Sequence, residues 1–510
     1  MDLNISTVRK NLAANFIGNG WIGLLGIVLI PFYIKLLGIE AWGVVGLYAS
    51  LQSICLLLDM GLSATLGREM ARLSAQKDKE QEMRNLVRTL ELIYWAVAAA
   101  IGVSIFALAP FIANRWLRAG NLSPETINQA VRVMALAIAL QWPFGLYSGG
   151  VSGLQRQVLL NGINISIATL RGAGAVLILW KISPTLQAFF CWQVGISALQ
   201  TCLVGAYLWR SLPRTPFAAG FRGSLLRDTW RFAAGISGVT VMSLILIQMD
   251  KVVLSGLLRL ELFGYYVLAG TVASSIYLLI NPVFSAFAPR FTQLVSLDDE
   301  VGLKRLYHRS CQLMSVVILP VSCVMAFHSK EILFLWTGDA TTVEYTHLVL
   351  SILVAGTALN GLMHLPYCVQ LAYGWTRLAF CINAVAVVIL APSMVCVAAL
   401  YGAVGAAIIW VFLNLGFVLV GIPLMHRRLL KGEQRKWYLE DVGLPLMVAV
   451  CTGFFSSLLI PGTGSRLGLA ANLACGLLFV AGSTLLATPV TRASFFGFCR
   501  SRKRMFSGIA

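Results

Sequence analysis

The sequence predicts an all-α integral membrane protein with about fourteen transmembrane helices, and three observations support this class. Hydrophobic residues make up 58% of the chain, charged residues only 12%, and the mean hydropathy is +0.80. Soluble chains carry roughly 45–50% apolar and about 25% charged residues. Apolar stretches of about 20 residues, long enough to cross a bilayer as helices, recur throughout. A short phrase also occurs twice, which indicates an internal duplication.

The predicted spans follow one another with short connections. They cover residues 11–36, 42–66, 89–113, 130–151, 159–180, 185–208, 232–257, 264–288, 310–328, 346–371, 378–398, 401–425, 442–460 and 465–488. No connection between them exceeds about 25 residues. A folded soluble domain usually needs at least about 50 residues, so the sequence predicts none.

The repeated phrase has the form L-x-x-E-x-[WF]-G and marks the turn between the first and second helix of each repeat. Its copies are Leu37–Gly43 and Leu258–Gly264, 221 residues apart. We expect its glutamate at a helix N-terminus and its aromatic residue at the membrane interface. The final glycines, Gly43 and Gly264, should permit close helix packing. The phrase predicts architecture rather than a substrate site.

Six spans per repeat place the start of both repeats on the same side, so the repeats are parallel. Residues 1–215 are predicted to form an N-terminal six-helix lobe and residues 216–430 a C-terminal six-helix lobe, arranged around a central cavity. Residues 431–510 would add two transmembrane helices and a basic cytoplasmic tail.

Basic residues set the orientation. With a cytoplasmic N-terminus, 29 of the 39 Lys and Arg fall in inside segments and 8 in outside segments. Both termini are therefore predicted to be cytoplasmic. Cytoplasmic loops that face anionic headgroups account for the net charge of +18 without a nucleic-acid partner.

Several short motifs in fixed order resemble the polysaccharide transporter family, the O-antigen and exopolysaccharide flippases of bacteria. They are Arg9-Lys10-Asn11 with Asn15, Pro31, Leu37-Gly38, Trp42-Gly43, Asp59–Ser63, Gly153–Arg156 and Met249-Asp250-Lys251 through Gly264-Tyr265-Tyr266. The resemblance covers nearly the whole chain. It places the chain in the multidrug/oligosaccharidyl-lipid/polysaccharide exporter superfamily.

The resemblance implies a non-enzymatic flippase in the bacterial inner membrane. It would move undecaprenyl-diphosphate-linked oligosaccharide units from the cytoplasmic to the periplasmic leaflet by alternating access. An ion gradient, of H⁺ or Na⁺, would drive transport, and no other cofactor is expected. A polysaccharide polymerase and other assembly proteins are the implied partners, for O-antigen or exopolysaccharide biosynthesis.

Ionisable residues inside spans are the first site candidates, because each costs about 2.5–3.5 kcal/mol at the helix centre. Arg171 lies deep in the fifth span and would bind a diphosphate or a sugar acid, or else pair with a buried acid. Lys251 is a cavity candidate, and Asp250 is a candidate for ion coupling; a structural bridge is the alternative for both. Asp59 is a coupling candidate with two local alternatives, a pair with Arg68 or a turn cap.

Polar residues within spans are the second group of candidates. Asn15 and Asn19 share a face of the first span, Asn281 lies in the eighth span and His364 in the tenth. Helix–helix hydrogen bonding explains such stripes as well as a cavity does, and His364 is equally consistent with a satisfied packing histidine. No catalytic or metal-binding residues are predicted.

Three other functions share part of this pattern. A lipid II flippase has the same plan, but the first helices here lack a dense arginine cluster. A multidrug-type cation antiporter is disfavoured by intramembrane Arg171 and Lys251, which would repel a cationic drug. A membrane polymerase or glycosyltransferase needs a catalytic outside loop, and the outside segments are short.

Overall fold

The computed structural model describes residues 18–76, 78–459 and 465–489, and it leaves the side chains of residues 224–237 undescribed. Within these ranges the chain is helical apart from turns and one isolated bridge between Arg118 and Arg259. Thirteen helices in the described part are long and apolar enough to cross a membrane. The all-α membrane fold is confirmed.

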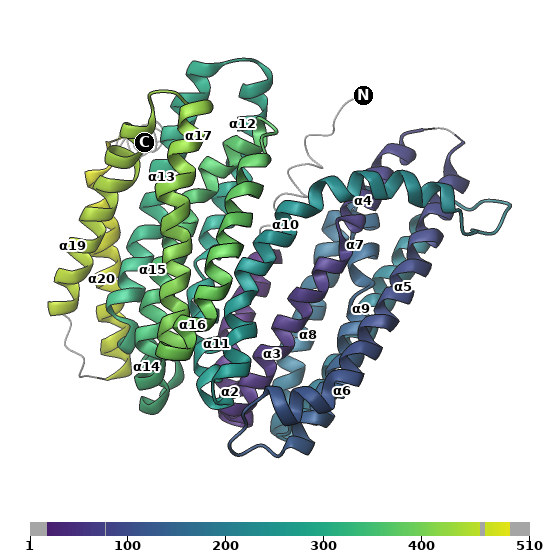
Figure 1. The fold of residues 1–510 in the computed structure, drawn as a ribbon, viewed down its shortest axis with the longest axis horizontal. Coiled ribbons are helices and arrows are strands. Elements are labelled where there is room, and N and C mark those ends of the chain that lie inside the picture. Colours follow the sequence, from purple (N-terminus) through teal and green to yellow (C-terminus); the bar gives the residue numbers. More distant parts are fainter. Residues whose placement is uncertain (1–17, 77, 460–464, 490–510) are drawn as a thin grey trace, which may run out of the picture. The chain divides into compact units, whose positions relative to one another are not determined.

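The contacts divide the chain into two compact units between Val267 and Leu268, each a bundle of long helices (Figure 1). The first holds α2 (Ile30–Leu37), α3 (Ile39–Cys55), η1 (Leu56–Asp59), α4 (Leu62–Ser74), α5 (Glu80–Phe111), η2 (Ile112–Trp116), α6 (Pro124–Gln141), α7 (Phe144–Gly153), α8 (Gln157–Lys181), α9 (Leu186–Ser211), α10 (Gly223–Leu257) and the start of α11 (Leu260–Ser274). The second holds α12 (Tyr277–Ser296), α13 (Glu300–Phe327), α14 (Ser329–Thr337), α15 (Ala340–Ala372), α16 (Arg377–Gly416), η3 (Phe417–Gly421), α17 (Ile422–Arg428), α18 (Gln434–Lys436), η4 (Trp437–Gly443), α19 (Leu444–Leu459) and α20 (Arg466–Ala487).

The thirteen helices account for all fourteen predicted spans. The longest, Arg377–Arg428, contains both the eleventh and the twelfth predicted span. Its backbone is non-helical at Gly402, with φ 59° and ψ −136°, a conformation that glycine adopts readily and other residues do not. Gly402 therefore marks the turn expected between the two spans.

Three predicted spans are each built from two helices. The second span breaks at Met60 and Gly61, which have φ of 47° and 76° in the left-handed region, so α3 and η1 end there and α4 begins. The fourth breaks before Pro143, between α6 and α7. The eighth breaks between α11 and α12, so Asn281 lies in a different helix from the start of that span.

Helix starts repeat with the offset found in the sequence. Helices α3 and α11 begin 221 residues apart, at Ile39 and Leu260. Helices α5 and α13 begin at Glu80 and Glu300, 220 residues apart, and α8 and α16 at Gln157 and Arg377, also 220 apart. The chain is thus duplicated in its secondary structure as well as in its sequence.

The two copies of the repeated phrase pack directly against each other. A Cβ added at Gly43 would lie 2.6 Å from the carbonyl oxygen of Leu260, and one added at Gly264 would lie 2.3 Å from that of Ile39. Each glycine therefore lets its helix approach the backbone of the other copy, as predicted.

The other residues of the first copy depart from expectation. Trp42 is only 7% exposed and stacks on Tyr33 at 6.1 Å between ring centroids, so it is a packing residue and not an interface residue. Glu40 lies in the first turn of α3, as expected, but its carboxylate accepts hydrogen bonds from the backbone amides of Gly120, at 2.5 Å, and Asn121, at 3.0 Å. It therefore ties down the loop after η2.

The compact units and the predicted lobes divide the chain at different places. Helix α10 packs on α3, α4 and α5, so the contacts assign it to the first unit. The lobe boundaries at 215/216 and 430/431 follow from the repeat and stay predictions.

A buried polar cluster fastens η4 to α13. The side chain of His308 lies between two carboxylates, with Nδ1 2.5 Å from Asp441 and Nε2 3.0 Å from Glu433. Gln312 donates to the second oxygen of Asp441 at 3.0 Å, and Lys304 lies 3.7 Å from Glu433. Asp441 is completely buried, so its charge depends on these partners.

Gly264→Ala should destabilise the protein, because its methyl group would overlap the backbone of Ile39. The cost should be about 1–3 kcal/mol, as for overpacked cores. Gly270→Ala is the matched control, since it lies in the same helix and a Cβ there meets nothing within 4 Å. Thermal unfolding of both variants in detergent checks this, and equal stability of the two would contradict the packing account.

Asp441→Asn should also lower stability, because it removes one charge from a buried cluster and leaves the rest uncompensated. Loss of one partner of a buried pair costs about 3–5 kcal/mol. Glu440→Gln, at an exposed neighbour in the same element, should change the unfolding free energy by less than about 0.5 kcal/mol. Limited proteolysis of the η4–α19 segment gives a second readout, and it should speed up only in Asp441→Asn.

Candidate functional site

Arg171 lies on α8 inside a cluster of neutral side chains. Its guanidinium donates to the side-chain oxygens of Gln141 at 2.6 Å, Gln200 at 2.9 Å, Gln193 at 3.2 Å and Ser197 at 3.4 Å. Gln141 comes from α6 and the other three from α9. Spacings of three and four residues place those three on one face of α9.

No carboxylate in the described part of the chain forms an ion pair with Arg171. The ionisable side chains that interact with it are Tyr33 and Tyr48, which are neutral phenols. Hydrogen bonds to amides satisfy the donors of a guanidinium but leave its charge in place. Among the described residues the positive charge of Arg171 is therefore not balanced locally, and the predicted alternative of a pair with a buried acid finds no partner among them.

A polar cavity of about 690 Å³ adjoins this cluster. Its lining is mostly small or uncharged; it consists of Ser63, Ala64, Gly67, Ala71, Phe144, Gly145, Ser148, Gly149, Ser152, Gly153, Gln155, Gln157, Leu160 and Asn164. Asn164 connects it to the cluster, because its side-chain oxygen accepts from Gln200 at 3.4 Å. We call this the α4–α7–α8 cavity.

Glycines bring α4 and α7 together beside the cavity. A Cβ at Gly149 would lie 2.3 Å from the carbonyl oxygen of Ser63, and one at Gly153 would lie 2.1 Å from that of Gly67. The backbones of α4 and α7 therefore lie close together here, and hydroxyl and amide side chains line the adjoining cavity. Hydroxyls and amides are suited to hydrogen-bonding a sugar.

Asp59 lies at the break between η1 and α4, at the edge of the cavity. One carboxylate oxygen accepts from the hydroxyl of Ser63 at 2.9 Å, and the other accepts from the hydroxyl of Tyr94 on α5. Both oxygens thus bond hydroxyls. The partner of Asp59 in this structure is a pair of hydroxyl groups rather than the Arg68 considered from the sequence.

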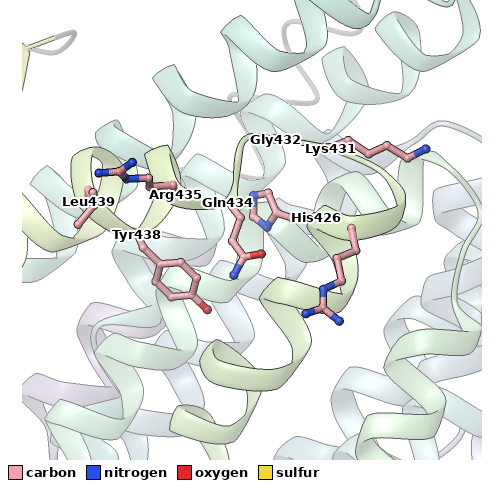
Figure 2. Close-up of a pocket in the computed structure, with 8 residues that line it drawn as sticks. His426, Lys431, Gly432, Gln434, Arg435, Tyr438 and Leu439 are labelled. Atoms are coloured by element: carbon pink, nitrogen blue, oxygen red, sulfur yellow. The ribbon is translucent and has the colours of Figure 1, made fainter.

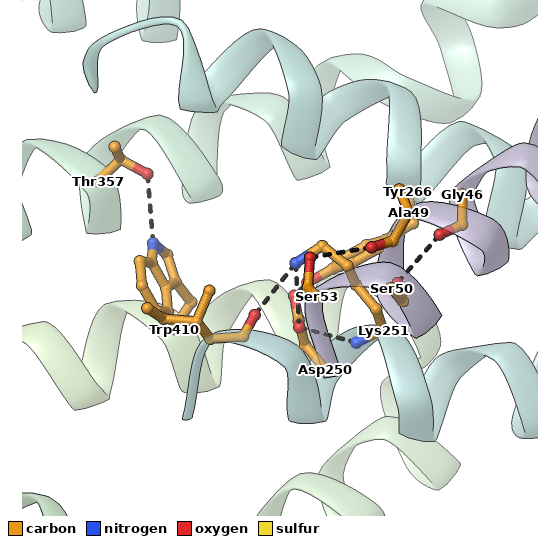
Figure 3. A network of polar contacts seen from close by, with 10 residues as sticks. Gly46, Ala49, Ser50, Ser53, Asp250, Lys251, Tyr266, Thr357 and Trp410 are labelled. Carbon is orange, nitrogen blue, oxygen red and sulfur yellow. Dashed lines mark hydrogen bonds and ion pairs between the residues drawn. The ribbon is translucent and has the colours of Figure 1, made fainter. Parts of the chain in front are cut away.

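Asp250 and Lys251 interact, although consecutive helical residues point in different directions. The Lys251 ammonium lies 3.5 Å from Asp250 Oδ1 and 3.1 Å from the carbonyl oxygen of Ile247. Asp250 Oδ2 accepts from the Tyr266 hydroxyl at 2.5 Å. Figure 3 shows this group. The predicted bridging role of Asp250 is therefore present in the structure, within the first unit.

Two serines of α3 that are drawn beside this group, Ser50 and Ser53, do not bond to it. Ser50 donates to the carbonyl oxygen of Gly46 at 3.0 Å and Ser53 to that of Ala49 at 2.9 Å (Figure 3). Each serine hydroxyl therefore bonds a backbone carbonyl oxygen of its own helix.

The remaining predicted residues are dispersed. Asn15 lies outside the described residues, whereas Asn19 and Asn281 are exposed. His364 on α15 hydrogen-bonds the carbonyl oxygen of Asn360 at 3.0 Å and lies between the rings of Tyr277 and Phe284, each with a centroid 6.0 Å away. This arrangement matches the packing histidine considered from the sequence.

A polar relay beside His364 was not predicted. Tyr277 donates to Asn360 at 2.9 Å, Asn360 donates to Asn414 at 2.7 Å, and Asn414 donates to the carbonyl oxygen of Trp410 at 2.8 Å. It joins α12, α15 and α16 of the second unit.

Sequence reasoning also missed the glutamines around Arg171 and the buried Glu91. Glu91 on α5 pairs with Arg88 at 2.8 Å and accepts from Tyr147 at 2.6 Å and Trp209 at 3.1 Å. A carboxylate within the predicted third span was a usable signal for it. The glutamines carry no charge, so the only signal was the common face of Gln193 and Gln200 on α9, and Gln141 on α6 had none.

The bundle of long apolar helices, with polar clusters inside it, defines a multi-pass membrane protein. Residues 8–295 match the family described as "Polysaccharide biosynthesis protein", and residues 237–397 match the family described as "MatE". The first match covers more than half of the chain. The chain therefore belongs to the polysaccharide biosynthesis protein family.

Two curated relatives agree with this. The "Putative O-antigen transporter" of Shigella flexneri is 23% identical over 406 residues, which are 79% of this chain and 94% of the relative. The "Uncharacterized membrane protein EpsK" of Bacillus subtilis (strain 168) is 23% identical over 367 residues, 69% of this chain and 68% of the relative.

Solved structures share the fold. The lipid II flippase MurJ in an inward closed conformation aligns with a TM-score of 0.67 and 13% identity, over 93% of this chain and 97% of MurJ. A multidrug resistance MATE family transporter in an inward-facing conformation aligns with a TM-score of 0.64 and 14% identity, over 81% of this chain and 96% of the transporter. The relatives with a described activity are transporters or flippases.

Proposed function

We propose that the protein flips undecaprenyl-diphosphate-linked oligosaccharide units from the cytoplasmic to the periplasmic leaflet of a bacterial inner membrane. Its termini would be cytoplasmic, and it would serve O-antigen or exopolysaccharide biosynthesis beside a polymerase and other assembly proteins. Family membership and the O-antigen transporter relative support the substrate class.

The observation that carries the proposal is Arg171, a guanidinium within the helical bundle that no described carboxylate neutralises. A cation at this depth is costly, and it is stabilised when an anion approaches. A diphosphate is such an anion, and a guanidinium binds phosphate oxygens with paired hydrogen bonds. A cationic drug would be repelled, which favours the lipid-linked anion over multidrug export.

The cavity next to this cluster suits the other part of the substrate. Serine hydroxyls and the amides of Gln155, Gln157 and Asn164 offer both donors and acceptors for a glycan. Arg171 would exchange its hydrogen bonds to the glutamine side chains for hydrogen bonds to a phosphate. The lipid tail would stay in the hydrocarbon outside the bundle.

Coupling to an H⁺ or Na⁺ gradient is assigned to Asp250, with Asp59 as a second candidate. Asp250 combines a carboxylate, a neighbouring ammonium and a phenol donor on adjoining helices. Protonation or Na⁺ binding would release Lys251 from the carboxylate. The freed ammonium would change the charge that α10 presents, while the Tyr266 hydroxyl keeps α10 linked to α11.

Depletion of the protein should cause lipid-linked repeat units to accumulate on the cytoplasmic face, and Arg171→Ala should fail to relieve this. A hydrogen bond to a charged group contributes about 1.5–3 kcal/mol, so transport by the variant should fall about tenfold or more. Arg132→Ala is the matched control, since that arginine is exposed on α6 of the same unit.

A glycosidase-accessibility assay of labelled repeat units in spheroplasts, at equal expression levels, distinguishes the two leaflets. Absence of cytoplasmic accumulation would overturn the flippase proposal. Full transport by Arg171→Ala would overturn only the proposed role of Arg171, and the flippase proposal itself would stand.

Asp250→Asn should abolish gradient-dependent transport and leave substrate binding intact. The asparagine oxygen still accepts from Tyr266, so local packing is kept while the negative charge is lost. Asp250→Glu, which restores the charge, should recover part of the transport. Uptake into proteoliposomes with and without a pH or Na⁺ gradient checks this, and an undiminished gradient response in Asp250→Asn would contradict it.

A further inference from the structure

A basic pocket of about 610 Å³ lies in the second unit, between α17, α18 and η4. Its lining consists of His426, Arg427, Lys431, Gly432, Gln434, Arg435, Tyr438 and Leu439. Figure 2 shows Gln434 next to His426, with Arg435 and Lys431 on opposite sides. It lies in the connection between the twelfth and thirteenth predicted spans, on the face predicted to be cytoplasmic.

Three exposed cations surround this pocket: Arg427, Lys431 and Arg435. None of them forms an ion pair within the part of the chain that the structure describes. Two nearby acids, Glu433 and Asp441, are engaged with His308, and the exposed Glu440 does not line the pocket. No carboxylate is among the lining residues, so the charge presented to the pocket is positive.

The wall of the pocket is fixed by internal hydrogen bonds. His426 Nδ1 lies 2.9 Å from the carbonyl oxygen of Ile422, and its Nε2 lies 3.2 Å from the Tyr307 hydroxyl. The first contact requires a proton on Nδ1, and in the neutral ring Nε2 then accepts from the Tyr307 hydroxyl. Tyr438 donates to the carbonyl oxygen of Val418 at 2.6 Å. A wall held by internal hydrogen bonds, with three exposed cations beside it, is suited to a compact anion.

Exposed apolar side chains next to the pocket point to a lipid rather than a free anion. Leu439 lines the pocket itself and is 57% exposed. Val420 on η3, Leu424 on α17 and Met447 on α19 continue the apolar surface into the adjoining helices. Acyl chains attached to a bound headgroup would cover this surface, whereas a free phosphate would leave it bare.

We infer that the basic pocket binds the phosphate headgroup of an anionic phospholipid from the cytoplasmic leaflet. Basic residues at the cytoplasmic surface contribute about 1 kcal/mol each to the attraction of anionic lipid, so three of them make a selective site. The Glu433–His308–Asp441 cluster would hold the pocket in shape. This inference does not depend on the proposed transport substrate.

The test is native mass spectrometry of the detergent-purified full chain titrated with phosphatidylglycerol. The wild type should retain one phosphatidylglycerol more tightly than phosphatidylcholine. The combined variant Arg427→Gln/Lys431→Gln/Arg435→Gln should bind phosphatidylglycerol about tenfold more weakly or worse. Arg435→Glu, a single exposed change that spares the fold, should weaken binding in the same direction.

Arg210→Gln/Arg214→Gln/Arg222→Gln is the matched control, because it removes three exposed arginines from another segment predicted to be cytoplasmic. It should bind phosphatidylglycerol as the wild type does. An equal loss in this control, or unchanged binding by both pocket variants, would overturn the inference. Displacement of the lipid by millimolar inorganic phosphate would also overturn it, since the site would then belong to a free anion.

Discussion

Close contact between the two copies of one short phrase is the constraint on which the first unit depends. Gly43 meets the backbone of Leu260, and Gly264 meets the backbone of Ile39. Any larger side chain at either position would push the start of α3 away from the start of α11. Helix α3 leads to the break at Asp59, and α10, which carries Asp250 and Lys251, directly precedes α11. The glycine contact therefore sets the position of both groups of ionisable residues.

Uncharged groups, rather than counter-ions, stabilise the most deeply placed cation. Arg171 donates four hydrogen bonds, to three amide oxygens and one hydroxyl oxygen, and its charge remains uncompensated among the described residues. A buried acid would have neutralised the site and lowered its attraction for an anionic lipid. The adjoining cavity of hydroxyls and amides continues the same chemistry toward a glycan. Elsewhere in the chain, charged clusters serve packing, as at Glu91 and Asp441.

The helical architecture was predictable because bilayer thickness imposes a long apolar signal on each span. The breaks were not, since the turn at Met60 and Gly61 depends on backbone angles that no apolar pattern reports. Charged Arg171 was recognised because charge is rare in a span. Gln141, Gln193 and Gln200 were not, because neutral side chains show their role only once α6, α8 and α9 pack together.

The central claim is that Arg171 binds the diphosphate of a lipid-linked oligosaccharide. Its most direct test compares how the purified wild type and Arg171→Gln bind two short-chain ligands, a polyprenyl-diphosphate oligosaccharide and the same oligosaccharide on an uncharged polyprenol. The account predicts that the variant loses affinity for the diphosphate ligand by about tenfold or more and keeps its affinity for the uncharged ligand. Equal affinity of both proteins for the diphosphate ligand would contradict it.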